Sequence, residues 1–248
     1  MKLVVVIPAL NEESAIGQVI RNIPRNISGI SETEVLVVDD GSTDDTADVA
    51  LQSGASVVVR NVRTLGVAKT VKEGLSTAVG LGADLICLID ADGQHNPLEM
   101  QGLVNPILNG QADVVIGSRF RDTLYRRNAP LLRRIANRLM AGLVNMLIST
   151  KITDAECGYR ALSAYAAKRL SLLGYLTFTY DMLIDLSSKR FKITEVPVSV
   201  RYFEGRRSRA VPHLAIYGFG CCLLVFLKSL LSLKNGKEPR RQLPYQSR

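Results

Sequence analysis

The segment from Leu85 to His95 constrains the fold of this chain more than any other. Five apolar residues, LICLI, run without interruption into Asp90 and Asp92. An apolar run of this length, bounded by turn-forming residues, predicts a strand that is buried on both faces, as in parallel sheets covered by helices. Ligands of such sheets bind beyond the carboxyl ends of the strands, where the two aspartates lie.

The spacing of these acids suggests a metal site. Alternate residues of a strand point the same way, so Asp90 and Asp92 share one side and Gln94 continues the series. Two carboxylates and an amide are hard oxygen ligands that suit Mg²⁺ or Mn²⁺, with a bound phosphate completing the coordination shell. The simpler interpretation is a polar turn, because Asp and Gly are common turn residues.

Strand and helix patterns alternate over the first half of the chain. Short β-branched and apolar segments occur at Lys2–Ile7, Glu34–Val38, Ser56–Val59 and Val114–Ile116, with helical patterns between them. This alternation predicts an α/β fold with a mostly parallel, Rossmann-like sheet flanked by helices.

A second strand also ends in acids. Asp39 and Asp40 directly follow the Glu34–Val38 segment. Carboxylates at two strand ends of one sheet could serve a nucleotide, since they accept hydrogen bonds from base and ribose and hold a metal for the phosphates. The chain has neither a G-x-x-x-x-G-K-[ST] loop nor a G-x-G-x-x-G after its first strand, so a glycine-loop phosphate site is excluded.

The composition favours an anion-binding protein in a reducing compartment. Lys and Arg number 31 against 23 Asp and Glu, which gives a net charge of +8. The four cysteines show neither metal-type spacing nor a disulfide framework. The first residues enter a strand-like segment without a signal-peptide pattern, and we therefore expect a cytoplasmic location.

A basic helix is predicted over Pro130–Ser149. Seven arginines and a single acid lie between Arg119 and Arg138. On a helical wheel, a wide apolar arc lies opposite a polar arc that contains Arg133, Arg134 and Asn137. Three interpretations remain open: a solvated charged face over a core helix, a membrane-surface helix whose arginines bind a lipid phosphate, and a nucleic-acid surface. The last is disfavoured because few aromatic residues accompany the arginines.

The C-terminal part divides into two segments. An apolar run from Ala215 to Leu227 resumes as far as Leu233, and it is shorter than the roughly 20 residues that cross a bilayer. We expect the α/β domain to occupy residues 1–210, a membrane-interface or oligomerisation helix to occupy 211–233, and a basic, disordered tail to occupy 234–248. This arrangement predicts peripheral attachment to anionic lipid, with a homo-oligomer as the alternative.

Several motifs in this order resemble those of the family-2 glycosyltransferases of GT-A fold. They are VIPALNE at 6–12, VDDGSTD at 38–44, DADGQ at 90–94 and GSR at 117–119. The closer likeness is to the polyprenyl-phosphate branch, which includes dolichyl-phosphate mannose synthase. That likeness is carried by DAECGYR at 154–160, EVP at 195–197 and GRRSR at 205–209.

The resemblance implies a metal-dependent, inverting enzyme. Such an enzyme moves one sugar from a GDP-mannose-type or UDP-glucose-type donor to a polyprenyl or dolichyl phosphate on the cytoplasmic face of a membrane, and it needs Mg²⁺ or Mn²⁺. Nucleic acid is not expected as a partner.

The residue patterns and the resemblance together assign residues to four roles. The candidate catalytic residues are Asp154, Asp92 and Arg119. The metal ligands would be Asp90, Asp92 and Gln94. The nucleotide-sugar site would contain Pro8, Leu10, Asn11, Glu12, Asp39, Asp40, Asp90, Arg206 and Arg209. The acceptor phosphate would be held by Arg119, Arg133, Arg134 and Asn137.

Two other functions are compatible with these motifs. A family-2 transferase could act on a hydroxyl of a glycan or glycolipid, in which case Asp154 would serve as a base. A non-catalytic, membrane-binding scaffold is the alternative of another class. The intact Asp90-x-Asp92-x-Gln94 series disfavours a scaffold, because a decayed site has no reason to keep metal-ligand spacing.

Overall fold

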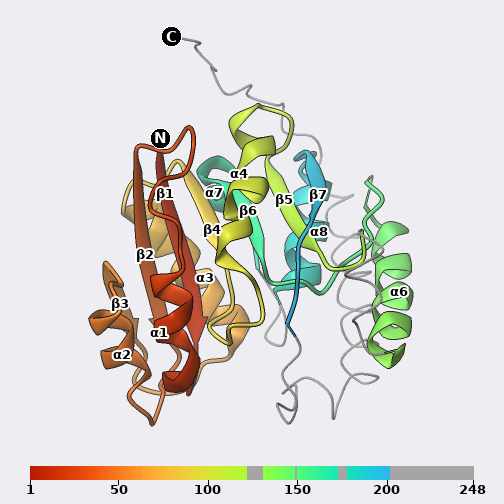
Figure 1. Cartoon of the computed structure of the whole chain (residues 1–248). Coiled ribbons are helices and arrows are strands. Elements are labelled where there is room, and N and C mark those ends of the chain that lie inside the picture. Colours follow the sequence, from red (N-terminus) through yellow and green to blue (C-terminus); the bar gives the residue numbers. More distant parts are fainter. Residues whose placement is uncertain (122–130, 149, 173–177, 202–248) are drawn as a thin grey trace.

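The computed structural model of the chain describes residues 1–121, 131–148, 150–172 and 178–201 (Figure 1). Several predictions concern residues outside these ranges. They include the 211–233 helix, the 234–248 tail and the two arginines Arg206 and Arg209.

The described residues form one sheet of seven strands in the order β3-β2-β1-β4-β6-β5-β7. β6 runs antiparallel to its neighbours β4 and β5, and every other pair is parallel. β5 therefore runs in the same direction as β4. The strands are β1 (Lys2–Ala9), β2 (Glu32–Asp39), β3 (Val57–Arg60), β4 (Leu85–Leu88), β5 (Val114–Ser118), β6 (Arg160–Ser163) and β7 (Ile193–Pro197).

Helices cover both faces of this sheet. In Figure 1, α1 and α4 lie in front of the strands, α3, α7 and α8 lie behind them, and α6 stands beyond β7 at one side. The helices are α1 (Glu13–Arg21), α2 (Thr46–Gln52), α3 (Val67–Gly80), α4 (Met100–Leu108), α6 (Leu131–Asn145), α7 (Ala164–Arg169) and α8 (Thr179–Ser188), with a 3-10 turn, η1, at Pro97–Glu99. Among the described residues, none of these helices has the length and apolar character to cross a bilayer.

The central strands explain the architecture. All four residues of β4 and the core of β1 are fully buried, as their unbroken apolar sequences predict. The predicted α/β fold with a mostly parallel sheet is confirmed. β6 is the strand that the sequence pattern misses, because a buried arginine, Arg160, opens it. Its reversed direction brings the loop before it, residues 153–159, to the same sheet edge as the ends of β4 and β5.

Close packing of α3 on the sheet depends on Gly74. A Cβ at this position would overlap Val6 Cγ1 of β1 and would lie 3.2 Å from Val38 Cγ2 of β2. Both neighbours are β-branched residues in buried strands, so neither can rotate away easily. Gly74 therefore sets the distance between α3 and the two strands that lead to the acidic edge.

We predict that Gly74→Ala lowers the free energy of unfolding by about 1–3 kcal/mol, because it overpacks this contact. Gly80→Ala is the matched control, since a Cβ there meets nothing within 4 Å at the exposed end of the same helix. The control should be neutral or stabilising by up to about 1 kcal/mol, because alanine favours helix over glycine. Urea unfolding of both variants checks this, and equal stability of the two would contradict the packing argument.

Candidate functional site

Polar residues from several strands meet at one edge of the sheet. β2, β4 and β5 run in the same direction, so Asp39, Asp90 and Arg119 lie at or just past their carboxyl ends. Because β6 runs antiparallel to β4 and β5, the loop that precedes it, residues 153–159, lies at the same edge. The structure thus brings together the two acidic segments and the GSR segment that the sequence singles out.

The Asp39 carboxylate has one oxygen available for a ligand. Asp39 is fully buried, and its Oδ1 accepts a hydrogen bond from the Ser42 backbone N–H at 2.9 Å. Arg60 Nε lies 3.3 Å from Oδ2, but among the described residues no donor is aligned to bond this oxygen. A buried carboxylate oxygen without a hydrogen bond is costly, and an N–H group of a ligand could supply one.

Asp40 has a different role in the structure. Its Oδ1 accepts hydrogen bonds from Asn61 Nδ2 at 3.2 Å and Leu65 N at 2.8 Å, and its Oδ2 accepts one from Gly66 N at 2.9 Å. The carboxylate therefore fastens the 61–66 loop beside the end of β2.

The loop after β1 is tied to the loop after β2. Asn11 has a left-handed backbone (φ 52°), its N–H donates to Ser42 Oγ at 2.9 Å, and its Oδ1 accepts from Thr43 N at 2.8 Å. Glu12 N donates to Thr46 Oγ1 at 2.8 Å. Pro8 and Leu10 are half-buried at the start of this region. The four residues predicted from this motif thus border the Asp39 segment.

Asp90 and Asp92 repel each other at the end of β4. Burial and the nearby Asp92 charge raise the pKa of Asp90 to about 6, while Arg119 opposes this increase. Asp92 Oδ1 accepts a hydrogen bond from Gln94 N at 2.9 Å, which turns the chain after the two acids. A bound divalent cation would relieve the repulsion between the two carboxylates.

The space around Asp90 suits a metal ligand. A Cβ on Gly158 would lie 2.9 Å from both carboxylate oxygens of Asp90, so the glycine keeps room for this group. Within the described part of the chain, no group of three or more His, Cys, Asp or Glu side chains could hold a metal ion. The candidate set has two carboxylates and the Gln94 amide, and it fits Mg²⁺ or Mn²⁺ only if ligand phosphate supplies further oxygens.

His95 is a neutral neighbour of this group. Burial and the Arg119 charge lower the pKa of His95 to about 4. Its Nε2 lies 4.0 Å from Asp90 Oδ2 and 3.8 Å from Cys157 Sγ. The imidazole therefore contributes no positive charge to the acids at neutral pH.

Arg119 forms an ion pair with the fully buried carboxylate of Asp154. Arg119 Nε and NH2 donate to the two Asp154 oxygens at 2.7 and 2.8 Å, and Arg119 N donates at 3.1 Å. The backbone N–H groups of Glu156 and Cys157 add two more bonds at 3.2 Å. Burial alone would raise the pKa of Asp154, but Arg119 and these hydrogen bonds hold it below its ordinary value.

The helix α6 supplies one buried candidate and one that is half-buried. Asn137 is 2% exposed, and its Nδ2 donates to the Thr153 carbonyl oxygen at 2.7 Å, one residue before Asp154. Arg134 is half-buried on the same helix. Arg133 lies on α6, but its side chain is outside the described part of the structure.

The sequence motifs contain two further buried residues to which no site role was assigned. Arg160 is fully buried and donates to three carbonyl oxygens, those of Ala155, Cys157 and Thr179, at 2.7–3.0 Å. Glu195 of β7 accepts hydrogen bonds from Thr153 and Asp154. Both residues belong to motifs visible in the sequence, but only the fold shows that they hold the Asp154 loop.

Comparison with known proteins agrees with this geometry. Residues 4–171 match the family model described as Glycosyl transferase family 2. Over 252 residues, the chain is 29% identical to the UDP-N-acetylglucosamine–dolichyl-phosphate N-acetylglucosaminyltransferase of Methanococcus voltae, covering 94% of this chain and 96% of that protein. It is 29% identical to the undecaprenyl-phosphate mannosyltransferase of Micrococcus luteus, with 80% and 83% covered.

A solved structure shares the fold. The glucosyl-3-phosphoglycerate synthase of Mycobacterium tuberculosis, in complex with Mn²⁺, uridine diphosphate and glucosyl-3-phosphoglycerate, aligns with a TM-score of 0.66 at 26% identity. The alignment covers 90% of this chain and 79% of that one.

We predict that Asp154→Asn lowers the free energy of unfolding at pH 7 by about 3 kcal/mol, because it removes the buried carboxylate that pairs with Arg119 and leaves the Glu156 carboxylate, at 4.0 Å, as a more distant counter-charge. The folded-state pKa of Asp154 is depressed. The stabilisation by its ionised form is therefore complete above the unfolded pKa of about 4 and is lost as the pH falls through the lower folded value.

The difference between wild type and Asp154→Asn should narrow as the pH falls below about 4. Denaturant unfolding at a series of pH values measures it. Asp84→Asn is the control, because this exposed carboxylate accepts one backbone bond from Lys2 and should contribute only about 1 kcal/mol. A difference that is small at pH 7, or constant with pH, would show that the ion pair contributes little to stability.

Proposed function

The chain belongs to Glycosyl transferase family 2, and on that premise we propose that it moves a single sugar, with inversion, from a nucleotide-diphosphate sugar to the phosphate of a polyprenyl lipid at a membrane surface. The observation that carries the proposal is the sheet edge, where the acids after β2 and β4 lie beside the Arg119–Asp154 pair. Such an edge separates a cation-binding side from an anion-binding side.

The nucleotide would bind over the ends of β1 and β2. The unsatisfied Asp39 oxygen would accept a hydrogen bond from a base N–H, which supports a base that carries such a donor, as uracil and guanine do. Asn11 and Glu12 border this position, and Leu10 offers an apolar contact. Asp40 would act indirectly, by holding the 61–66 loop.

The divalent cation would lie between the carboxylates of β4 and the donor diphosphate. Asp92, Gln94 and Asp90 are the candidate ligands, and the M. tuberculosis relative was solved with Mn²⁺ and uridine diphosphate. When bound, the cation would offset the charge that develops on the departing diphosphate. Arg206 and Arg209, which lie outside the described residues, remain candidates for contacts to the same phosphates.

A phosphate acceptor fits the protein groups better than a hydroxyl acceptor. A phosphate is already ionised at neutral pH, so its oxygen can attack without a general base. Asp154, which the hydroxyl mechanism would use as a base, accepts five N–H donors and is fully buried. The candidates to hold the phosphate remain Arg119, Arg133, Arg134 and Asn137. The charge of Arg119 also acts on Asp90, since it opposes the increase in pKa that burial causes in that carboxyl.

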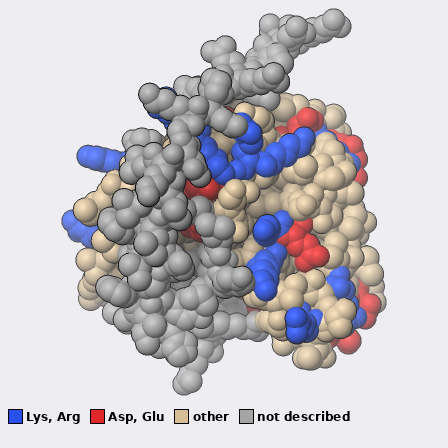
Figure 2. Space-filling model, turned by 180° about the vertical axis from the view of Figure 1, so that it is seen from behind, with Lys and Arg blue, Asp and Glu red and all other residues tan. Residues whose placement is uncertain are grey.

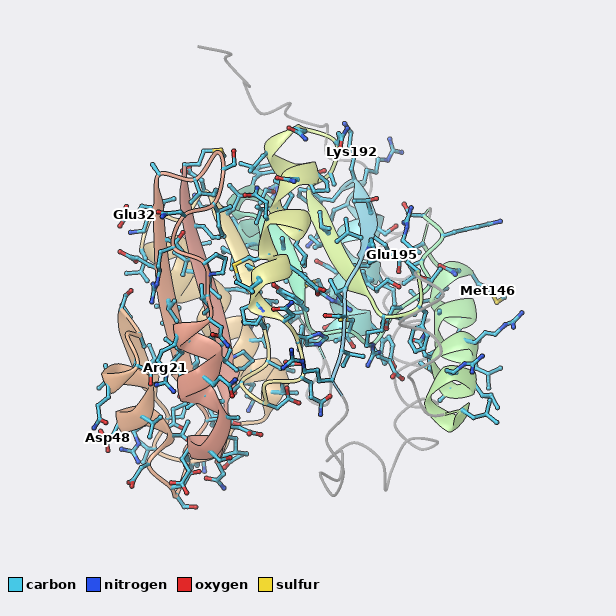
Figure 3. The ribbon with its side chains drawn as sticks, viewed as in Figure 1. Arg21, Glu32, Asp48, Met146, Lys192 and Glu195 are labelled. Carbon is cyan, nitrogen blue, oxygen red and sulfur yellow. The ribbon has the colours of Figure 1, made fainter. Side chains whose placement is uncertain are left out.

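The outer face of α6 supports action at a membrane surface. Leu131, Ile135, Leu139 and Leu143 are 43–66% exposed on this helix, and Met146 just after it is 81% exposed. Met146 points away from the molecule in Figure 3. α6 contains arginines but no acid, and Figure 2 shows basic side chains projecting from the same margin of the molecule. An apolar stripe flanked by cations fits an anionic lipid surface.

The proposal is tested by offering nucleotide-diphosphate sugars with three acceptors: a short polyprenyl phosphate, the matching polyprenol and phosphoglyceric acid. We expect transfer to the polyprenyl phosphate alone and dependence on Mg²⁺ or Mn²⁺. Transfer to the polyprenol would support a hydroxyl acceptor. Transfer to phosphoglyceric acid would point to a soluble substrate, and no transfer with any donor would support the scaffold interpretation.

In this assay, Asp92→Asn should lower kcat by about 100-fold or more, because charge stabilisation worth several kcal/mol is lost with the metal. Asp48→Asn on the exposed side of α2 is the control and should leave kcat unchanged. Near wild-type turnover of Asp92→Asn in Mn²⁺ would remove Asp92 from the metal site.

Leu139→Glu should weaken binding to vesicles containing anionic lipid by about tenfold or more, the equivalent of losing the burial of one leucine. Leu51→Glu, at a similarly exposed leucine of α2, is the matched control and should bind as wild type does. Vesicle pelleting at two salt concentrations measures both variants. Equal binding of wild type and Leu139→Glu would exclude α6 as the lipid-facing surface.

A further inference from the structure

Glu195 is a buried carboxylate that none of the nucleotide, metal or acceptor assignments uses. It lies on β7, is 6% exposed, and stands on the side of that strand that faces α6 (Figure 3). Its Oε1 accepts hydrogen bonds from the backbone N–H groups of Thr153 and Asp154 at 2.8 and 2.9 Å. Its Oε2 accepts one from Thr153 Oγ1 at 2.9 Å.

Thr153 extends this contact to the residue before Arg119. Thr153 gives its only hydroxyl proton to Glu195, so in the 2.7 Å contact between Ser118 Oγ and Thr153 Oγ1 the serine must donate. Ser118 Oγ in turn accepts from Phe120 N at 3.2 Å. A directed chain of hydrogen bonds therefore fixes the backbone on both sides of Arg119 relative to Glu195.

Asp154 carries the effect to the arginine itself. Glu195 holds the Asp154 backbone N–H, while the Asp154 side chain holds Arg119 by two guanidinium bonds. On the opposite side, Asn137 Nδ2 of α6 holds the Thr153 carbonyl oxygen. The guanidinium direction is thus set by a segment that is anchored from β7 and from α6.

We propose that Glu195 is a positioning residue: through Thr153 and Asp154 it orients the Arg119 guanidinium toward the acceptor anion, and Asp154 serves as the orienting counter-ion instead of a base. The identity of that anion as a lipid phosphate rests on the proposed function. The orientation of Arg119 does not, because it follows from hydrogen bonds between described residues of the protein itself.

Glu195→Gln tests the first part without reference to any substrate. The glutamine oxygen can still accept the two backbone N–H bonds, but its NH₂ group cannot accept from the Thr153 hydroxyl. Hydrogen exchange of the Arg119 Nε–H, followed by NMR in ¹⁵N-arginine-labelled protein, should become at least about tenfold faster, because the Asp154 bond opens more often.

The control is a carboxylate in a matching position at the other end of the same strands. Asp113 Oδ2, just before β5, accepts from the backbone N–H of Lys192, just before β7, at 2.8 Å. Lys192 lies at the end of β7 remote from the Asp154 loop (Figure 3). Asp113→Asn should leave the Arg119 exchange rate within twofold of wild type. Equal acceleration in both variants would reveal general loosening and overturn the positioning role.

Kinetics test the second part. Glu195→Gln should raise KM for the polyprenyl phosphate about tenfold and leave KM for the donor within about twofold. In the Arg119→Lys background, the two guanidinium bonds to Asp154 cannot form. There, Glu195→Gln should raise the acceptor KM by less than about a further twofold, because both changes act on one interaction. Equal effects on donor and acceptor KM, or full additivity in the double variant, would overturn the proposal.

Thr153→Val is a second variant that tests the same hydrogen-bond chain if Glu195→Gln does not fold. It removes the hydroxyl link but keeps the carboxylate and its two backbone bonds, and Thr153 is exposed enough to accept valine. Its acceptor KM should rise at least as much as that of Glu195→Gln, because it loses the same hydroxyl bond and also the contact with Ser118, whereas a value equal to wild type would contradict the hydroxyl chain. If wild type transfers nothing to polyprenyl phosphate, the proposed function fails, and the NMR exchange still decides whether Glu195 orients Arg119.

Discussion

A buried carboxylate must be surrounded by donors, and the way Asp154 meets this requirement organises one half of the site. Its five hydrogen bonds come from Arg119 and from the backbone of residues 156 and 157. Removing both charges from water is costly, and the pair persists because almost every lone pair has a donor. The ends of β5 and β6 are consequently held together, and Arg119 has a fixed direction before any ligand arrives.

The other half of the site has the opposite electrostatic character. Asp90 and Asp92 are two close acids, and the pKa of Asp90 rises to about 6 because burial and mutual repulsion disfavour its charge. The adjacent His95 is neutral, since burial lowers its pKa to about 4. Gly158 keeps space beside Asp90 that any side chain would fill. Two acids and a cationic side chain therefore meet at one sheet edge, as the proposed transfer from a diphosphate to an anionic acceptor requires.

Much of this arrangement follows from the sequence, for identifiable reasons. The apolar run before Asp90 is buried on both faces only in the middle of a sheet that helices cover. It therefore predicts both the fold and the position of the acids. Asp39 and Arg119 follow in the same way from the strands that precede them. Local pattern cannot reveal β6, because its leading residue is a charged arginine that is buried by bonds to three carbonyl oxygens.

The contacts of Glu195 are equally invisible to local pattern, since its partners at 153 and 154 are about 40 residues away in the chain. The sequence also does not distinguish Asp39 from Asp40. Only the folded loops show that Asp40 accepts hydrogen bonds from residues 61–66, while one Asp39 oxygen has no hydrogen-bond donor among the described residues. Neighbouring acids of one motif thus receive different roles from tertiary contacts.

We propose that a lipid phosphate oxygen, and no hydroxyl, receives the sugar. NMR of the product formed from a ¹³C-labelled donor sugar and polyprenyl phosphate tests this directly. We expect a coupling between the anomeric carbon and the single phosphorus of the lipid, with the anomeric configuration opposite to that of the donor. A product whose anomeric carbon shows no coupling to phosphorus would contradict it.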